Sequence, residues 1–541
     1  LERDYSVDLE RITESIKNKY LNNKLNVPLK AFFGNISKSN YIRRKEPSIA
    51  IYDKNININQ MRVIYNALKF PITYVQGPPG TGKTQTILNV VLSSFFGNKT
   101  VLVCSSNNKP VDGILEKLKF KYNDEEVLFP YLRLGNKKEV LEATKKICAL
   151  YEFKTDKVVK NNLIEKIKIS ADDSNKKLIE LLNIQERRVL LEDYIESSQK
   201  LIRSLSKKSQ MYENLMKKIS DFNEELSNLP EIKNKDLLNL YKPVKSDYYL
   251  QQFLYYKSLD YINKLHKPIN KRLIDICYIK DEVEKISEFN NWIENDKNFQ
   301  SLIEIFPIIF STNISSSRLG GNNFQFDLVV MDESSQCNIA HSLIPISKAN
   351  SLLLVGDPNQ LKPVIILENS INDDLMNKFN IPSSYNYVNY SILDVMRNHD
   401  NISKYILLKY HYRCGKKIIG FSNKRYYNSS LDLSNIKDEG ELLFIDVKNK
   451  NVVQKNEAYD EAIAIIDYIK RNKIKDVAII TPFVNQQKLI NKMLSENNLT
   501  NIHCGTIHSL QGSEKDSIIL STALSYKTSK KPIIGLKIIL H

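Results

Sequence analysis

An eight-residue stretch, residues 77–84, constrains the fold of this chain more than any other segment. It reads G-P-P-G-T-G-K-T, follows an apolar run at residues 72–75 and precedes a second apolar run at residues 87–92. Glycines at this spacing let successive backbone amides turn inward around a phosphate, while a following helix directs its positive end toward the same point. The pattern therefore predicts a phosphate-binding loop between a buried strand and a helix, rather than an accidental surface turn.

The residue types of this loop predict a nucleotide bound together with magnesium. Lys83 has the position whose ammonium group reaches the β- and γ-phosphate oxygens, and the Thr84 hydroxyl has the position that binds Mg²⁺. The other predicted nucleotide contacts are Gly77, Pro78, Pro79, Gly80, Thr81 and Gly82.

Composition narrows the class of protein. The 541 residues suffice for two to four domains, and 42% hydrophobic with 26% charged residues is ordinary for a soluble globular protein. Lysine and arginine outnumber aspartate and glutamate by 78 to 62, which gives a net charge of +16. This excess favours a polyanionic partner such as nucleic acid, and a basic surface without such a partner is the alternative.

Cysteine usage and hydropathy indicate the compartment. The six cysteines are scattered, with no C-x-x-C pair and no cysteine–histidine cluster of zinc spacing, which argues for a reducing compartment and against a structural metal. No apolar run reaches the roughly 18 residues of a membrane span, and the start of the chain is too charged for a signal peptide. We therefore expect a cytoplasmic protein with no membrane segment.

Glycine and proline are absent from residues 136–229. Within this span apolar residues recur at helical spacing; they are Met211, Leu215, Ile219, Phe222, Leu226 and Leu229. We predict a helical insertion over residues 136–299, either a stalk or an antiparallel hairpin. Its charged residues could contact nucleic acid or a protein partner, but a solvated helix face is the favoured interpretation.

On both sides of this insertion, short apolar runs that end in polar residues indicate parallel strands with crossover helices. The candidate strands are residues 100–104, 305–310, 328–331, 352–355, 441–447, 476–480 and 517–520. We therefore predict an α/β protein with two parallel-sheet domains, the first over residues 49–135 and 300–372 and the second over residues 373–541. Residues 1–48 would be the end of a preceding region.

An acidic pair follows the predicted strand at residues 328–331. The carboxyl ends of parallel strands lie where a phosphate-binding loop opens. Asp332 is therefore placed to hold the magnesium shell, and Glu333 to polarise the attacking water. Acidic pairs after strands are common, so this assignment depends on the phosphate-binding loop upstream.

The next predicted strand ends in G-D-P-N-Q-L-K-P-V at residues 356–364. Gln360 would lie near the γ-phosphate but on a different strand from the carboxylates, so it could sense hydrolysis and pass it to a neighbouring domain. Here the sequence resembles superfamily 1 helicases of the Upf1-like, Sen1-like and Dna2-like branch, whose motif reads close to G-D-x-x-Q-L-P-P. The resemblance covers about residues 50–120 and 305–525.

The resemblance implies further nucleotide contacts. Gln60 matches the family's Q motif, in which the glutamine reads adenine. The segment Y-H-Y-R-C at residues 410–414 resembles the family's Q-Y-R-M-H, which implies that Tyr412 lies against adenine and that Arg413 is an arginine finger on the γ-phosphate. Residues 506–516 resemble the motif T-V-[DH]-x-x-Q-G-x-E-x-D, which implies contacts from Gly512 and Glu514.

The resemblance also implies residues that contact nucleic acid. In the segment after the predicted strand at residues 100–104, Asn108, Val111 and Asp112 match a motif that the family uses against the nucleic-acid backbone, whereas positions 109 and 110 depart from it. An ordinary strand-to-helix connection is the alternative. Thr506 and His508 belong to the half of the later motif that contacts nucleic acid.

The function implied by the resemblance is mechanical. ATP and Mg²⁺ would be the cofactors, ATP would be hydrolysed between two RecA-like lobes, and the protein would move along single-stranded DNA or RNA, 5′ to 3′. Two alternatives stay open: a P-loop ATPase that drives a coiled-coil arm, and a catalytically weakened helicase-like module that binds nucleic acid.

One family motif has no counterpart in this chain. The family pattern continues to R-R-L-N-V-A-L-T-R-A, whose later arginine is a second finger, but this chain has no arginine after Arg471. We therefore expect a truncated or frame-shifted piece of a longer protein, which the start at Leu1 rather than methionine also suggests; the alternative is that Arg413 works alone. An arginine finger is worth about 10³ to 10⁵ in rate, so such a piece would bind ATP and single strands, hydrolyse ATP very slowly and not unwind duplexes.

Overall fold

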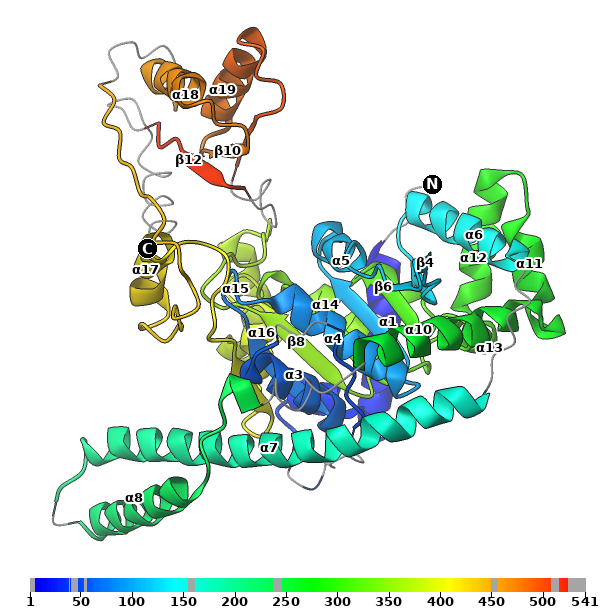
Figure 1. Ribbon diagram of the computed structural model, residues 1–541, viewed down its shortest axis with the longest axis horizontal. Coiled ribbons are helices and arrows are strands. Elements are labelled where there is room, and N and C mark those ends of the chain that lie inside the picture. The colour runs from blue at the N-terminus through cyan, green and yellow to red at the C-terminus, as the bar shows by residue number, and fades with distance from the viewer. Residues whose placement is uncertain are drawn as a thin grey trace. The chain divides into compact units, whose positions relative to one another are not determined.

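The computed structural model describes residues 5–37, 39, 47–52, 56–153, 161–207, 209–236, 246–448, 456–506 and 515–523 (Figure 1). The chain divides into two compact units. The first comprises Leu1–Arg413 and Leu431–Asn435, and the second comprises Cys414–Ser430 and Ile436–His541. Each unit has its own parallel sheet and its own hydrophobic core.

A seven-stranded parallel sheet forms the centre of the first unit, in the order β5-β6-β2-β7-β8-β1-β9. Its strands are β1 (Ile72–Gln76), β2 (Val101–Ser105), β5 (Tyr131–Arg133), β6 (Ile308–Thr312), β7 (Leu328–Met331), β8 (Leu352–Gly356) and β9 (Lys404–Leu407). Side chains alternate between two cores: Leu352 and Leu354 lie in one, and Leu353 and Val355 in the other. Because both faces are buried, these strands are continuous apolar runs in the sequence.

The predicted α/β fold with parallel strands is confirmed. The predicted strands at 100–104, 305–310, 328–331 and 352–355 correspond to β2, β6, β7 and β8. β6 begins only at Ile308, after Pro307, which has no N–H to donate to a ladder. β5 and β9 were not predicted, because each is only three or four residues long and has little periodicity to recognise.

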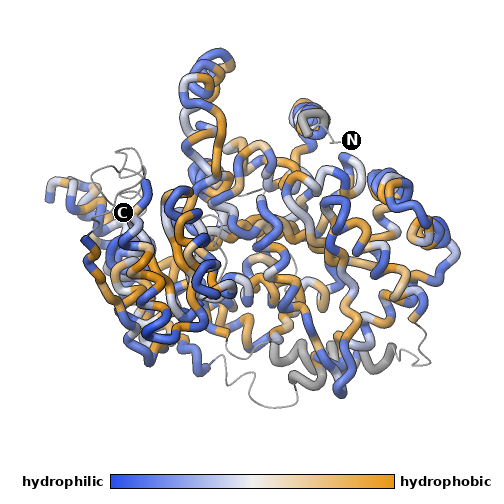
Figure 2. The backbone as a smooth tube through the Cα atoms, turned by 90° about the horizontal axis from the view of Figure 1, so that it is seen from above, coloured by the Kyte–Doolittle hydropathy of each residue, from blue (hydrophilic) through white to orange (hydrophobic). Residues whose placement is uncertain are grey.

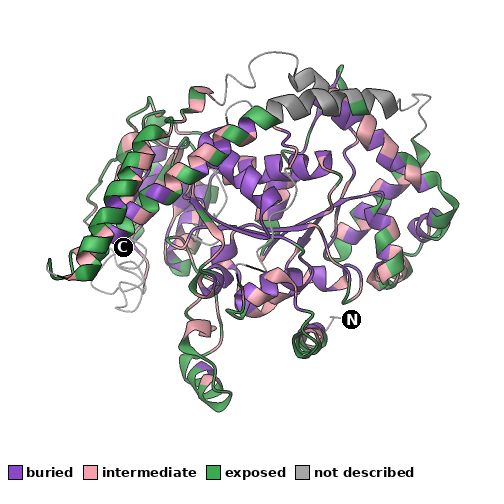
Figure 3. Cartoon of the chain, turned by 90° about the horizontal axis from the view of Figure 1, so that it is seen from below, coloured by how far each residue is buried: buried purple, intermediate pink, exposed green. Residues whose placement is uncertain are grey.

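Helices cover both faces of this sheet (Figure 3). One face carries α1 (Tyr5–Leu21), α2 (Val27–Phe32), α6 (Lys137–Glu152), α11 (Lys271–Cys277), α12 (Glu282–Glu294), α13 (Asp296–Ile303), α14 (Ile339–Ser347) and α16 (Ile392–His399). The other carries α3 (Ile58–Lys69), α4 (Lys83–Phe96), α5 (Asn108–Leu115), α10 (Ser246–Asn263) and part of α7 (Asn161–Ile202). Apolar and hydrophilic stretches alternate along many helices in Figure 2, as expected of helices with one buried face.

The first compact unit extends further along the chain than the proposed domain boundary near residue 373. β9 pairs with β1 in parallel, from Thr73↔Lys404 to Gln76↔Leu407. This pairing is non-local, so the segment as far as Arg413 packs with the first unit. The remaining strands and α-helices in the described part of this unit are the hairpin β3 (Lys121–Tyr122) and β4 (Glu125–Glu126), α8 (Gln210–Asn228) and α15 (Asn369–Lys378).

The predicted helical insertion consists of helices α6 to α13 in the described residues. Along its outer half, α7 forms an antiparallel hairpin with α8 (Figure 1). The rings of Tyr194 and Phe222 meet edge to face with centroids 4.7 Å apart, and Arg187 pairs with Glu225 at 2.6 Å. The sequence allowed either a stalk or a hairpin, and the outer half of α7 forms a hairpin with α8.

The second unit contains a three-stranded parallel sheet in the order β11-β10-β12. Its elements are α17 (Lys416–Tyr426), α18 (Tyr459–Asn472), β10 (Val477–Ile480), α19 (Val484–Glu496), β11 (His503–Gly505) and β12 (Ser517–Leu520). The predicted strands at 476–480 and 517–520 correspond to β10 and β12.

The predicted strand at residues 441–447 is wrong. This segment has no regular secondary structure, and the Phe444 side chain is 91% exposed. An apolar run becomes a strand only where a neighbouring strand accepts its hydrogen bonds, and its own sequence does not provide that neighbour.

None of the described helices is both long enough and apolar enough to cross a membrane.

Candidate nucleotide-binding site

The predicted phosphate-binding loop connects β1 to α4 in the first unit, and its backbone conformation depends on glycine. Gly80 and Gly82 have φ angles of 73° and 81°, in the left-handed region. Gly82 is also the N-cap residue of α4, which begins at Lys83. A Cβ atom on Gly82 would clash with the Gln60 amide, one on Gly77 with the Lys83 side chain, and one on Gly80 with the His411 ring at 2.5 Å. The loop is therefore a close-fitting cradle with backbone amides at a helix N-terminus, which fits a polyphosphate.

The acidic pair predicted at the end of β7 lies against this loop. The Lys83 ammonium group is 3.1 Å from the Glu333 carboxylate, and both side chains are largely buried. Burial opposes the charge on Lys83, but the nearby Glu333 and Asp332 carboxylates outweigh it and raise the pKa of the ammonium group. The three residues thus form one coupled charge cluster.

The pKa of the Asp332 carboxyl group is shifted in the direction that favours its protonated form. Burial, followed by the charge of Glu333, raises the pKa of its carboxyl group to about 7, although Lys83 opposes the shift. Glu333 follows with φ of 49°, a left-handed conformation that is strained for a residue with a side chain, and its N–H donates to Asp332 Oδ1 at 2.9 Å. Strained backbone and a shifted pKa at one point are typical of a functional site.

Gln60 supports the loop from α3. Its side-chain oxygen accepts from the Asn57 N–H at 3.1 Å, while Asn57 Oδ1 accepts from the Gln60 N–H at 3.0 Å, which is a capping box at the start of α3. The Gln60 amide nitrogen donates to the carbonyls of Thr81 and Gly82 at 3.3 and 3.4 Å. In this arrangement the amide holds the phosphate-binding loop.

The segment after β9 reaches the same loop. The Tyr412 N–H donates to the Gly80 carbonyl at 2.9 Å, and the Tyr412 hydroxyl accepts from Asn57 Nδ2 at 3.0 Å. His411 is fully buried, and its Nδ1 lies 2.8 Å from the Pro79 carbonyl oxygen. Burial is the main cause that lowers the pKa of His411, which favours the neutral ring. Arg413 follows Tyr412 in the chain, and its Cβ lies 2.6 Å from the position that a Cβ on Gly80 would have.

Sequence reasoning missed His411 in this contact. The signal that could have found it is its position within Y-H-Y-R-C, directly before the two residues that were assigned to the nucleotide. Through its contact with the Pro79 carbonyl, the neutral imidazole of His411 holds the segment after β9 against the loop. This segment carries Tyr412 and Arg413.

Gln360 lies in the loop after β8, within the same unit. Its side-chain nitrogen donates to Asp357 Oδ2 at 3.0 Å, and its backbone N–H donates to the Asp357 carbonyl at 3.0 Å. Asp357 itself is fully buried. The structure therefore brings together Lys83, Glu333, Gln360 and the 411–413 segment at the carboxyl ends of β1, β7, β8 and β9.

Comparison with known families decides the identity of this arrangement. A family model described as an AAA domain matches residues 55–368, and a second model with the same description matches residues 388–536. The chain belongs to this AAA-domain family. Its relatives place it in the Upf1-like, Sen1-like and Dna2-like branch, so the resemblance inferred from the motifs is confirmed.

The curated relatives of this helicase-family chain are distant in sequence. An uncharacterized ATP-dependent helicase of Methanocaldococcus jannaschii is 23% identical, over 88% of this chain and 65% of the relative. Helicase sen1 of Schizosaccharomyces pombe is 23% identical, over 87% of this chain and 27% of the relative. The DNA polymerase alpha-associated DNA helicase A of the same organism is 20% identical, over 88% and 60%. The chain thus spans less than two thirds of the length of each of these relatives.

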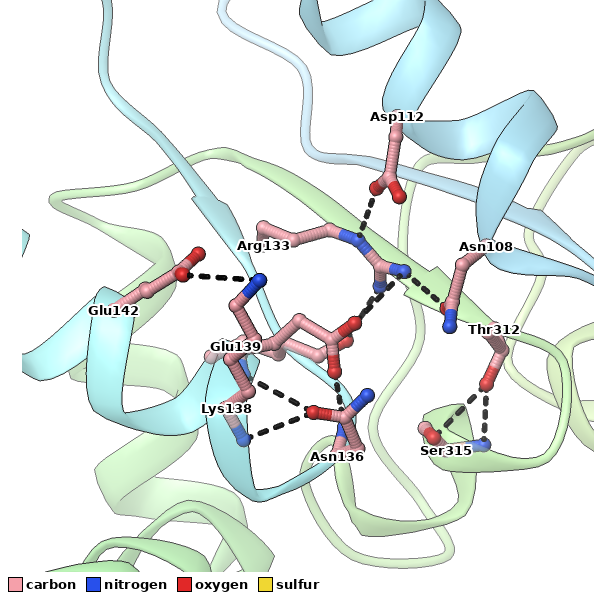
Figure 4. A network of polar contacts seen from close by, with 10 residues as sticks. Asn108, Asp112, Arg133, Asn136, Lys138, Glu139, Glu142, Thr312 and Ser315 are labelled. Atoms are coloured by element: carbon pink, nitrogen blue, oxygen red, sulfur yellow. Dashed lines mark hydrogen bonds and ion pairs between the residues drawn. The ribbon is translucent and has the colours of Figure 1, made fainter. Parts of the chain in front are cut away.

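Three residues that the helicase motifs assign to nucleic acid, Asn108, Val111 and Asp112, lie in α5, which follows β2 of the same sheet. Arg133, at the end of β5, donates to Asn108 Oδ1 at 2.6 Å and to Asp112 Oδ1 at 3.1 Å, so it connects two residues of α5 (Figure 4). It also pairs with Glu139 of α6 at 3.7 Å. Val111 is buried in the core, so its side chain acts in packing here.

Arg133 was not singled out by sequence reasoning. Its signal would have been a lone arginine at the end of a short strand, followed by leucine and glycine. Together with its neighbours it lines a cavity of about 290 Å³ between α5 and α6. Thr312 and Ser315, hydrogen-bonded to each other at 2.9 Å at the end of β6, lie next to this network (Figure 4).

The remaining assigned residues belong to the second unit or to the metal site. Thr506 follows β11 and is half-buried, whereas His508, Gly512 and Glu514 lie outside the described residues. The described residues contain no group of three or more histidine, cysteine, aspartate or glutamate side chains that could hold a metal by itself. Magnesium commonly uses one or two carboxylates together with substrate phosphates, so Thr84 and Asp332 beside a phosphate cradle fit this ion.

Proposed function

We propose that the chain is an ATP-dependent nucleic-acid helicase or translocase that hydrolyses ATP to move along single-stranded DNA or RNA, in the 5′ to 3′ direction. The observation that carries the proposal is the convergence of Lys83, the Asp332–Glu333 pair and the 411–413 segment on one glycine-lined loop. Membership of a helicase family supports the coupling of this hydrolysis to a nucleic-acid strand.

The proposed hydrolysis begins with an exchange of partners at Lys83. In the structure its ammonium group neutralises Glu333. A γ-phosphate in the cradle would compete for that ammonium group and leave Glu333 free to act as the general base. The Gln336 amide, 3.3 Å from Glu333 Oε2, would help to orient the carboxylate toward a water molecule.

The proposed magnesium site uses Thr84 and Asp332. Bound Mg²⁺ would neutralise phosphate charge during the transfer. Asp332 would bind the ion as a carboxylate, so it would have to lose the proton that burial favours. This exchange makes the site sensitive to pH near neutrality.

The proposed adenine and γ-phosphate contacts use α3 and the segment after β9. Tyr412 is partly exposed and fixed through its N–H, so its ring can lie against a base. Gln60 would read adenine only by giving up one of its contacts to the loop. Arg413 would contact the γ-phosphate, for which its planar fork is suited, and Gln360 would sense it.

The proposed nucleic-acid contacts are Asn108 and Asp112 in the first unit, and Thr506 and His508 in the second, with Gly512 and Glu514 linking that segment to the nucleotide. The net charge of +16 supports a polyanionic partner. A protein partner of the helical insertion and a cytoplasmic location are also part of the proposal.

The deciding experiment measures ATP hydrolysis by the whole chain with and without single-stranded DNA or RNA. Strong stimulation supports the helicase proposal. Turnover that does not depend on a strand would instead indicate an ATPase that drives an arm, and strand binding without turnover a weakened module. Strand affinity should also fall steeply with salt, since several cations would displace counterions from phosphates; a flat salt profile would contradict nucleic-acid binding.

A further inference from the structure

Three neighbouring strands of the large sheet end beside the nucleotide site. β1 lies between β8 and β9, and its last residue, Gln76, is level with Gly356 on one side and Leu407 on the other. Gln76 immediately precedes the phosphate-binding loop. Its side chain contacts Tyr405 of β9 and Asp357, the residue directly after β8.

A continuous chain of hydrogen bonds runs through Gln76. The Tyr405 hydroxyl of β9 donates to Gln76 Oε1, and Gln76 Nε2 donates to Asp357 Oδ1 at 3.2 Å. The second oxygen of Asp357 accepts from Gln360 Nε2 at 3.0 Å. Tyr405 and Gln360 are therefore connected through two side chains.

The hydrogen-bond partners fix the orientation of the Gln76 amide. If this amide were flipped, its oxygen would face the Asp357 carboxylate and its nitrogen the tyrosine hydroxyl, so the contact to Asp357 would become repulsive. Asp357 is in turn held by two backbone contacts: its own N–H donates to Ser335 Oγ at 3.1 Å, and the Asn359 N–H donates to Asp357 Oδ1 at 3.1 Å. A buried carboxylate with this many donors has one preferred orientation.

The other end of this chain of contacts lies on the segment that carries Arg413. The Arg397 guanidinium lies 4.0 Å from the centroid of the Tyr405 ring and restrains it. Eight residues after Tyr405 the chain reaches Arg413, where the first compact unit gives way to the second. A displacement of β9 would therefore move the Tyr405 hydroxyl and, through Gln76, the Asp357 carboxylate.

We infer that Gln76 and Tyr405 are positioning residues that set the side chain of Gln360 through Asp357 and couple it to the segment that carries Arg413. In the structure Gln360 is bonded to Asp357, so it must leave or pivot on that carboxylate to contact a γ-phosphate. The position of Tyr405 determines how firmly Asp357 retains it. This inference rests on the proposed function, because it assigns Gln360 a role in hydrolysis.

The test is a double-mutant cycle on the whole chain with Tyr405→Phe, Gln360→Ala and the two combined. Removing one hydroxyl should lower kcat about three- to tenfold, the scale of one hydrogen bond, with KM for ATP within about twofold. If Tyr405 acts through Gln360, the double variant should be no slower than Gln360→Ala alone. Gln76→Leu, which removes the amide at similar size, should show the same non-additivity and replaces Tyr405→Phe if that variant does not fold.

Tyr385→Phe is the matched control. Its hydroxyl donates to the Phe32 carbonyl at 2.7 Å, away from the nucleotide site, so it removes a comparable hydrogen bond and should leave kcat unchanged. Losses that multiply in the double variant, or a raised KM with unchanged kcat, would overturn the inference.

Each rate is measured with and without a single strand, which separates the two proposals. Rates that do not respond to the strand would contradict the proposed function, while non-additivity in those same rates would still support the inference. Additive losses in strand-stimulated rates would support the proposed function and contradict the inference. A wild-type chain without any measurable turnover would overturn both.

Discussion

The two compact units differ in how completely their strands are buried. In the first unit β2, β7 and β8 are buried along their whole length, because helices cover both faces of the sheet. In the second unit β12 alternates, with 55% of Ile518 and 44% of Leu520 exposed, and the apolar segment around Phe444 is also exposed. The first unit is thus closed around its core, whereas the second presents apolar strand residues to solvent.

This difference separates two tasks. The nucleotide-site residues that the structure brings together, as far as Arg413, belong to the closed unit. Such a unit can hold a strained, charged loop because its core over-determines the backbone. We therefore expect nucleotide binding to depend on the first unit, and the conversion of binding into movement to require the second.

The largest expected effect is on hydrolysis. Glu333→Gln should lower the hydrolysis rate by about 10² to 10⁴, the scale of a lost general base, while ATP affinity is retained. Lys83→Ala should weaken ATP binding as well, because the ground-state phosphates already use its charge. Nucleotide titration and single-turnover hydrolysis measure the two effects. Glu284→Gln, an exposed carboxylate on α12, is the matched control, and unchanged turnover in Glu333→Gln would place the base elsewhere.

A pair of phenylalanine substitutions tests the difference in burial directly. Phe310→Ala, at a fully buried position of β6, should destabilise the first unit by about 3–5 kcal/mol, because it leaves a cavity. Phe444→Ala, which is 91% exposed, should change stability by no more than about 0.5 kcal/mol. The measurement is chemical denaturation, monitored by hydrogen exchange in each unit. A large loss at Phe444 would show that its segment is packed in solution.

The pH dependence of Mg·ATP use should reflect Asp332. Because its pKa is raised to about 7, the carboxylate that we propose as a magnesium ligand becomes populated only as pH rises through that value. We expect kcat/KM for Mg·ATP to rise about five- to tenfold between pH 6 and 8, since kcat/KM reports the free enzyme. A profile that is flat over this range would contradict the assignment of Asp332 to the metal.

The raised pKa of Asp332 also determines whether its contribution to the free energy of unfolding rises or falls with pH. Between its ordinary pKa of 3.8 and about 7, the folded chain holds a proton that the unfolded chain has lost. Its contribution to the free energy of unfolding should therefore fall as pH rises across this window. Asp332→Asn, which cannot ionise, should lose this part of the pH dependence in denaturation curves.

The smallest expected effect is on single-strand affinity and involves Arg133 at the end of β5. Arg133→Lys keeps the charge but loses the fork that reaches both Asn108 and Asp112, so single-strand affinity should fall about three- to tenfold. ATP affinity should not change. Fluorescence titration with a labelled strand measures the effect, and an equal loss of ATP affinity would show that this network supports the nucleotide site instead.

Prediction from sequence succeeded where neighbouring residues determine the structure. The loop at residues 77–84, the strands before and after the acidic pair and the helical insertion all depend on local spacing, and all were recognisable. It failed at β5 and β9, at the segment around Phe444 and at His411 and Arg133. In each of those cases the outcome depends on which distant strand or side chain lies alongside.

The sequence by itself determined that a glycine-rich loop joins a buried strand to a helix, because Gly80 and Gly82 permit left-handed backbone angles that other residues resist. It also predicted that Asp332 and Glu333 follow a buried strand, since they come directly after the apolar run at residues 328–331. Only the tertiary structure decided that β9 joins the first sheet, that Tyr405 and Asp357 meet across Gln76, and that Arg133 connects α5 to α6. The contact between Arg133 and Asp112 spans 21 positions of the chain, and that between Tyr405 and Gln76 spans 329. Pairing at such separations is set by packing of the whole unit, which no short stretch of sequence encodes.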